Sequence, residues 1–215
     1  MDDAEHEELP KSISIELQIG YDMNLLRLPF LENSHYKAES FIRHITNLAQ
    51  DYFMQIQRKR TFPYISWKIE NDILRLLDVN ITSDELCPTG NPQNDTKIQM
   101  IADKRRGRVP LILFTLDELT TSNLEAHVGC AEVSCVCDAN KIKRGVNFGV
   151  LDVTYLDGTE EERYQTMART MAHELGHMVI FVLYQEISLE KNYKIKLFIQ
   201  FKIFKIFILT LYALK

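Results

Sequence analysis

The segment from His173 to His177 reads His-Glu-Leu-Gly-His. On an α-helix, residues four positions apart project from the same face, so these two imidazoles can bind one Zn²⁺ ion. Glu174 follows the first histidine and can reach a metal-bound water, from which it would take a proton as general base. We therefore expect His173 and His177 to be metal ligands and Glu174 to be the catalytic residue of a metal-assisted hydrolysis.

The residues before this motif carry the signals of a helix start. Asp157 and Gly158 are typical of a turn. Thr159 and Glu162 have the spacing of a capping box, in which each side chain binds the backbone N–H of the other residue. Two further acidic residues in the first turn suit the positive end of the helix dipole. The sequence thus predicts one helix that runs from about residue 160 through the motif.

Other segments predict the elements that must support this helix. Period-two alternation predicts strands at 12–20 and 63–70, and a shorter apolar segment follows at 72–81. Apolar residues recur every three to four positions between residues 36 and 58, which predicts a long amphipathic helix. The members of that stripe are Phe41, Ile45, Leu48, Tyr52 and Ile56.

The second half of the chain adds two more strands. The run "VPLILFTLDEL" at 109–119 is continuously apolar, which is typical of a strand buried on both faces, and "GVNFGVLDVTYL" at 145–156 predicts another. The polar residues 83–109 predict a long surface loop, and a cysteine-rich loop separates the two strands. This order of elements predicts an α/β or α+β fold with one central mixed, mostly parallel sheet and long helices.

Composition bounds the class of protein. The chain has 215 residues, of which 46% are hydrophobic and 26% charged, and its formal net charge is −5. These values suit a globular domain and argue against a nucleic-acid partner, which needs a clustered basic surface. The short basic run Lys104-Arg105-Arg106 is expected to be a solvated loop. We predict an acidic, disordered lead-in at 1–11, a domain at 12–178 and a divergent tail at 179–215.

The cysteines and the N-terminus bear on location. Cys87, Cys130, Cys135 and Cys137 could form disulfides, or could in part bind a structural metal, and the pairing cannot be read from sequence. The sequons at Asn80 and Asn94 fit an extracellular setting. The N-terminus has no signal peptide, so the protein is cytosolic or this chain lacks its true start.

The tail changes composition abruptly after Met178. It has no Gly and no Pro, and Ile, Leu, Phe, Lys and Tyr dominate it. Its longest uncharged run, 206–214, is too short to span a bilayer. The tail could lie as an amphipathic helix on a membrane surface, form a terminal strand or helix, or be foreign to the domain, as translated AT-rich sequence would be.

Several segments together resemble one family. "TMAHELGH" at 170–177 looks like the active-site helix of the reprolysin or adamalysin group, the ADAM-type metzincin zinc proteases. The opening strand, the first long helix, the buried strand and the cysteine-bearing loop are similar to those of the same group, so the resemblance covers about residues 12–178. A leishmanolysin-like metzincin, also with a cysteine-rich approach to the helix, is the nearest alternative.

The resemblance implies a zinc-dependent metalloendopeptidase. It implies the metzincin upper subdomain, an edge strand that binds extended protein or peptide substrates, disulfides, and secretion to an extracellular setting. By position, His173 and His177 match the first two zinc ligands and Glu174 matches the general base.

The chain departs from the family after Met178. The metzincin pattern calls for glycine at position 180 and histidine at position 183, whereas this chain has Ile180 and Leu183. No later methionine can form the Met-turn, no later cysteine can pair with the loop, and we expect the lower subdomain to be missing. The alternative function is a catalytically inactive, truncated metzincin-like domain. Glu186, Glu190 and His127 are the other candidates for a third ligand.

Overall fold

The computed structural model describes part of the chain. The described residues are 12–57, 64–77, 100–101, 103–105, 109–116, 119–120, 126–127, 129–131, 139–145, 147–153 and 158–188. The predicted lead-in at 1–11, both sequons and the tail beyond residue 188 lie outside them.

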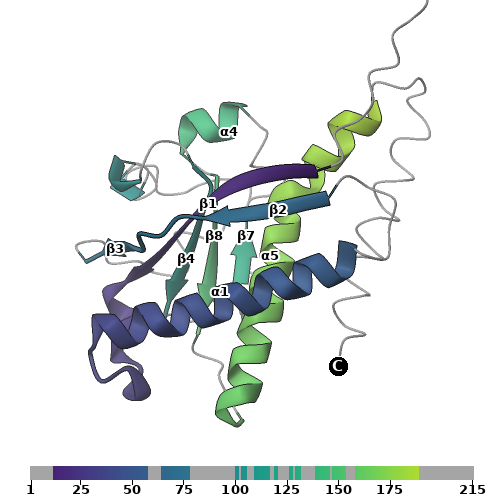
Figure 1. Ribbon diagram of the computed structural model, residues 1–215. Coiled ribbons are helices and arrows are strands. Elements are labelled where there is room, and N and C mark those ends of the chain that lie inside the picture. The colour runs from purple at the N-terminus through teal and green to yellow at the C-terminus, as the bar shows by residue number, and fades with distance from the viewer. Residues whose placement is uncertain are drawn as a thin grey trace, which may run out of the picture.

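A mostly parallel sheet forms the centre of the fold, as the sequence predicts (Figure 1). Its strand order is β2-β1-β4-β8-β7, and β3 pairs with the C-terminal end of β1. All pairs are parallel except β7 with β8, which is antiparallel. The strands are β1 (Ser12–Asp22), β2 (Tyr64–Ile69), β3 (Leu74–Leu76), β4 (Leu111–Thr115), β7 (Gly129–Ala131) and β8 (Phe148–Asp152), with β5 (Leu119–Thr120) and β6 (Ala126–His127) as a separate antiparallel pair.

Two long helices cover one face of the sheet. They are α1 (His35–Gln57) and α5 (Glu160–Ser188), which cross each other in Figure 1 and pack into the same buried cluster as the sheet. Two short 3-10 helices, η1 (Met23–Arg27) and η2 (Pro29–Leu31), lead from β1 into α1, and α4 (Ala139–Arg144) precedes β8. None of the helices in the described segments is long and apolar enough to cross a bilayer.

Side-chain alternation along β1 explains why the helices lie on that face. The odd-numbered residues point toward the helices and are buried, because successive residues of a strand face opposite sides. Ile112 and Phe114 of β4 and Leu151 of β8 join them in the same core. The residues of β1 in this core are Ile15, Leu17, Ile19 and Tyr21.

The opposite face of the sheet has a smaller core, and here two predictions were wrong: a surface loop throughout 83–109, and a solvated side chain at Arg105. Residues 100, 101, 103 and 104 are helical, and Ile101 is fully buried against Leu113 and its neighbours rather than lying in a surface loop. Arg105 is also buried, at 7% exposure. Its guanidinium donates to the side chain of Asn147 at 2.8 Å and to the carbonyl of Gly145. A charge with such partners can be buried, which the basic run alone did not reveal.

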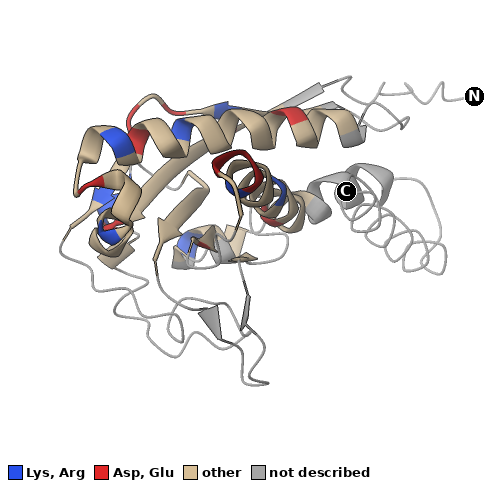
Figure 2. Cartoon of the chain, turned by 90° about the horizontal axis from the view of Figure 1, so that it is seen from below, with Lys and Arg blue, Asp and Glu red and all other residues tan. Residues whose placement is uncertain are grey.

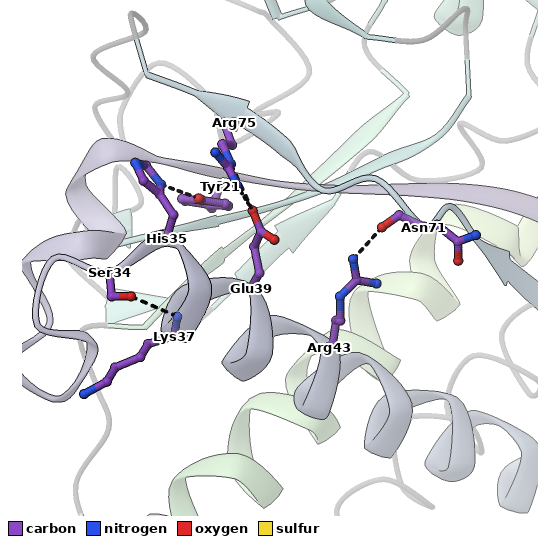
Figure 3. A network of polar contacts seen from close by, with 8 residues as sticks. All are labelled: Tyr21, Ser34, His35, Lys37, Glu39, Arg43, Asn71 and Arg75. Carbon is purple, nitrogen blue, oxygen red and sulfur yellow. Dashed lines mark hydrogen bonds and ion pairs between the residues drawn. The ribbon is translucent and has the colours of Figure 1, made fainter.

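Polar contacts fix the start of α1 against the end of the sheet (Figure 3). The Tyr21 hydroxyl lies 2.6 Å from Nδ1 of His35, the first residue of the helix. One turn later, Glu39 accepts two hydrogen bonds from Arg75 of β3, at 2.6 and 2.9 Å. These contacts join β1, β3 and α1 at one corner of the molecule.

Buried polar side chains meet where parallel strands end. Asp22, Thr115 and Asp152 are the last residues of β1, β4 and β8, and all three are fully buried. Asp22 Oδ2 accepts a hydrogen bond from Thr115 Oγ1 at 2.7 Å, and its Oδ1 caps η1 by accepting from Leu25 N at 3.1 Å. Burial nevertheless raises the pKa of Asp22 to about 6, because desolvation outweighs these hydrogen bonds.

We predict that Asp22 makes the stability of the fold depend on pH. Its pKa is higher in the folded than in the unfolded chain, so its contribution to the free energy of unfolding is complete below pH 4 and is lost as pH rises through about 6. Asp22→Asn should lessen this loss by on the order of 2 kcal/mol, measured by urea unfolding at pH 4.5 and 7.5. Parallel pH profiles for the wild type and the variant would contradict the assignment.

Candidate functional site

The start of α5 has the predicted capping box. Glu162 Oε2 accepts a hydrogen bond from Thr159 N at 2.8 Å, and Thr159 Oγ1 accepts one from Glu162 N at 3.3 Å. The acidic first turn of α5 is seen end-on in Figure 2. Both features suit the positive end of a helix dipole and fix where the helix begins. The cap thereby sets the position of every later residue of α5.

Packing fixes which way the histidines face. One face of α5 is buried against the sheet and α1. At 100° per residue, positions 173 and 177 lie on the opposite side of the helix. His173 and His177 are only half-buried there. The buried residues of α5 are Met167, Ala168, Met171, Ala172, Leu175, Met178 and Val179.

The two imidazoles converge on one point. His173 Nε2 and His177 Nε2 are 2.9 Å apart, and their ring centroids are separated by 4.6 Å at an interplanar angle of 81°. Two nitrogens bound tetrahedrally to one Zn²⁺ at about 2.05 Å would lie about 3.3 Å apart. The rings therefore need to separate by only a few tenths of an ångström to hold one metal ion, and they fit this role.

The electrostatics of the pair also suit metal binding. Burial lowers the pKa of His173. Burial and the nearby His173 lower the pKa of His177 to about 4. Both rings are thus neutral near pH 7, and neutral imidazole is the form that binds a metal.

Glu174 lies between the histidine face and the edge strand β7. It is 4% exposed, and burial raises the pKa of its carboxyl to about 8. A divalent cation held by the histidines would favour the ionised carboxylate, because an opposite charge stabilises the charged form. A Cβ atom on Gly129 of β7 would lie only 3.0 Å from Glu174 Oε1 and 3.0 Å from Thr170 Cγ2. Glycine at this position therefore gives Glu174 its space.

Sequence reasoning missed β7 and the role of Gly129. The cysteine-rich segment was predicted to be a loop, but residues 129–131 form a strand antiparallel to β8. Its three residues are too few for alternation to be detected. The only signal was the glycine itself, which often marks a close approach within a strand. Cys130 lies on this strand and is disulfide-bonded, while Cys87, Cys135 and Cys137 lie outside the described residues, so the pairing stays a prediction.

The described residues supply no third metal ligand. They contain no group of three His, Cys, Asp or Glu side chains that could hold an ion. Helix α5 continues through Ser188, so positions 180–183 form no turn, as the sequence suggested for Ile180. The backbone of Glu186 belongs to α5, and its side chain lies outside what the structure describes. His127 pairs with Leu119 in the β5–β6 ladder, and Glu190 lies outside the described segments.

No protein-family model matches the chain, and no curated protein matches it in sequence.

We predict that Gly129→Ala destabilises the fold through Glu174. The added methyl group meets the Glu174 and Thr170 side chains, and such overpacking lowers the free energy of unfolding by about 1–3 kcal/mol. The loss should shrink by on the order of 1 kcal/mol when Glu174→Ala is also present, as measured by urea unfolding in a double-mutant cycle. Gly20→Ala is the matched control, since its Cβ would meet the Leu74 carbonyl oxygen at 3.1 Å instead. Equal losses in both backgrounds at Gly129 would contradict the contact.

Proposed function

We propose that the protein is a zinc-dependent metalloendopeptidase with the upper-subdomain architecture of the reprolysin-like metzincins. The observation that carries this proposal is the convergence of His173 Nε2 and His177 Nε2 at 2.9 Å on a helix whose opposite face packs on a mostly parallel sheet. Glu174 lies beside them, buried against the edge strand. The resemblance of 170–177 to the reprolysin helix supports the same reading.

In this proposal the chain's own residues have separate tasks. His173 and His177 would hold the ion as neutral imidazoles. When bound, Zn²⁺ polarises the scissile carbonyl and lowers the pKa of a bound water toward 7. Glu174 would act as the general base toward the attacking water and, once protonated, as the acid toward the leaving amine. Its burial keeps bulk water from competing for the carboxylate.

The edge strand offers a place for an extended substrate. β7 pairs with β8 on one side and ends the described sheet on the other. A peptide can add to such an edge by backbone hydrogen bonds, which gives affinity without a sequence requirement. Gly129 lies on this strand next to Glu174, so a peptide that pairs with β7 passes close to the general base. Protein or peptide substrates, secretion and the disulfide pairing belong to the proposal on the strength of the resemblance.

The uninterrupted length of α5 favours a second candidate, a truncated domain that is catalytically inactive. The helix continues through Ser188, whereas the reprolysin pattern calls for a turn and a third histidine at position 183. Zinc held by two histidines alone is bound weakly, because structural and catalytic zinc sites have three or four protein ligands. A chain of this kind would act through binding rather than hydrolysis.

We predict that substitutions at the site separate metal binding from hydrolysis. His177→Ala should lower zinc affinity by more than about 100-fold. Loss of a residue that only hydrogen-bonds to a metal ligand already lowers metal affinity by about 10–100-fold. Glu174→Ala should keep the zinc but lower kcat for a quenched-fluorescent peptide by about 10²–10⁴. Metal analysis after dialysis and the chelator-sensitive cleavage rate provide the two measurements.

His44→Ala is the matched control for the zinc experiment. His44 is a histidine of the helical layer that packs edge-on against Tyr164, with ring centroids 4.6 Å apart, away from the site. Its loss should change neither zinc content nor cleavage. Zinc uptake without any chelator-sensitive cleavage would favour the inactive domain, and a chain that binds no zinc would overturn the metalloendopeptidase.

A further inference from the structure

We propose that Arg169 forms a carboxylate-binding subsite beside the two histidines, so that the preferred ligand is a peptide with an acidic side chain near the reacting bond. The preference for an acidic substrate rests on the proposed function. The carboxylate site itself is a property of the folded chain and needs no metal.

Arg169 lies on the same face of α5 as the histidines. It precedes His173 by four residues, and positions 169, 173 and 177 fall within an arc of about 80° around the helix. One helical turn, a rise of about 6 Å, separates Arg169 from His173. Two residues of an extended peptide span about 7 Å, so a side chain two or three residues from the reacting bond reaches this position.

The guanidinium of Arg169 is held in place but has no anionic partner among the described residues. It lies over the ring of Tyr52 of α1, with Cζ 5.6 Å from the ring centroid. The Tyr52 hydroxyl is in turn bonded to Gln165. Stacking covers one face of the guanidinium plane, and because Nε is buried, the two terminal Nη groups are the donors left for a ligand. Among the described residues no carboxylate forms an ion pair with Arg169, and its Nε is buried without a hydrogen bond.

Arg163 on the same helix shows the contrast. Its Nε donates to the carbonyl of Gly158 at 3.1 Å, so its side chain is tied to the loop before the helix. A half-buried cation without such a partner is costly to keep, because a buried donor loses its bonds to water. A carboxylate accepts two parallel N–H bonds from a guanidinium, which makes it the ligand that best satisfies Arg169.

The decisive experiment uses the metal-free chain and acetate as the probe. Acetate added at constant ionic strength against chloride should shift the Nε–Hε resonance of Arg169 in a saturable manner. The Arg163 resonance should not follow, and Arg169→Gln should abolish the response while Arg163→Gln leaves it intact. No shift at Arg169, or equal shifts at all arginines, overturns the proposal whatever the metal does. The wild-type titration decides this even if a variant fails to fold.

A second measurement ties the subsite to the histidines. Tripeptide hydroxamates with one glutamate, placed at each position in turn, are compared with their glutamine counterparts on the zinc-loaded full-length chain by calorimetry. We expect one glutamate position to bind about tenfold tighter, a difference that Arg169→Gln removes and Arg163→Gln keeps. Equal binding of all pairs by a chain that cleaves peptides overturns the substrate preference, while acetate binding by a chain without hydrolysis overturns only the proposed function.

Discussion

The orientation of α5 about its own axis, which decides which side chains face the core, is the constraint on which the rest of the site depends. Methionine, alanine and leucine side chains bury one face of this helix against the sheet and α1, and the capping box fixes where the helix starts. With both fixed, His173 and His177 can point only to the opposite side. A small rotation would carry the imidazoles toward either flank. The convergence of the two imidazoles is thus a consequence of core packing rather than of contacts between the histidines themselves.

The flanks of that outward face have different chemistry. On one flank, Glu174 and Thr170 contact Gly129 of β7, and on the other, Arg169 stacks on Tyr52 of α1. The histidines lie between a carboxyl group, Glu174, whose pKa burial raises to about 8, and a cation, Arg169, that forms no ion pair within the described part of the chain. The fold therefore places a buried carboxyl group and a stacked guanidinium on either side of the same two rings.

The sequence predicted most of the scaffold, because its signals were long and periodic. The alternation of β1 and the apolar stripe of α1 each persist over many residues, and the capping box of α5 is a specific four-residue pattern. All three are confirmed. Short elements were missed: β7 has three residues, and the helical turn around Ile101 lies in a polar segment. Burial of Arg105 could not be foreseen, since its partners Asn147 and Gly145 are some 40 residues distant. The spacing of His173 and His177 predicted their convergence, but no local pattern marks Gly129 or the stacking of Arg169.

The central position of β1 has a consequence for how the chain folds during synthesis. β1 pairs with β2 and β3 on one edge and with β4 on the other, and the hydrogen bond from Thr115 to Asp22 joins residues separated by 93 positions. At about 5–20 residues per second, a ribosome needs roughly 5–20 s to deliver β4 after β1. During that time one edge of an apolar strand has no partner, and such edges pair readily with other chains. The nascent chain is therefore most prone to aggregation before residue 115 has emerged, and a chaperone that shields β1 would act in this interval.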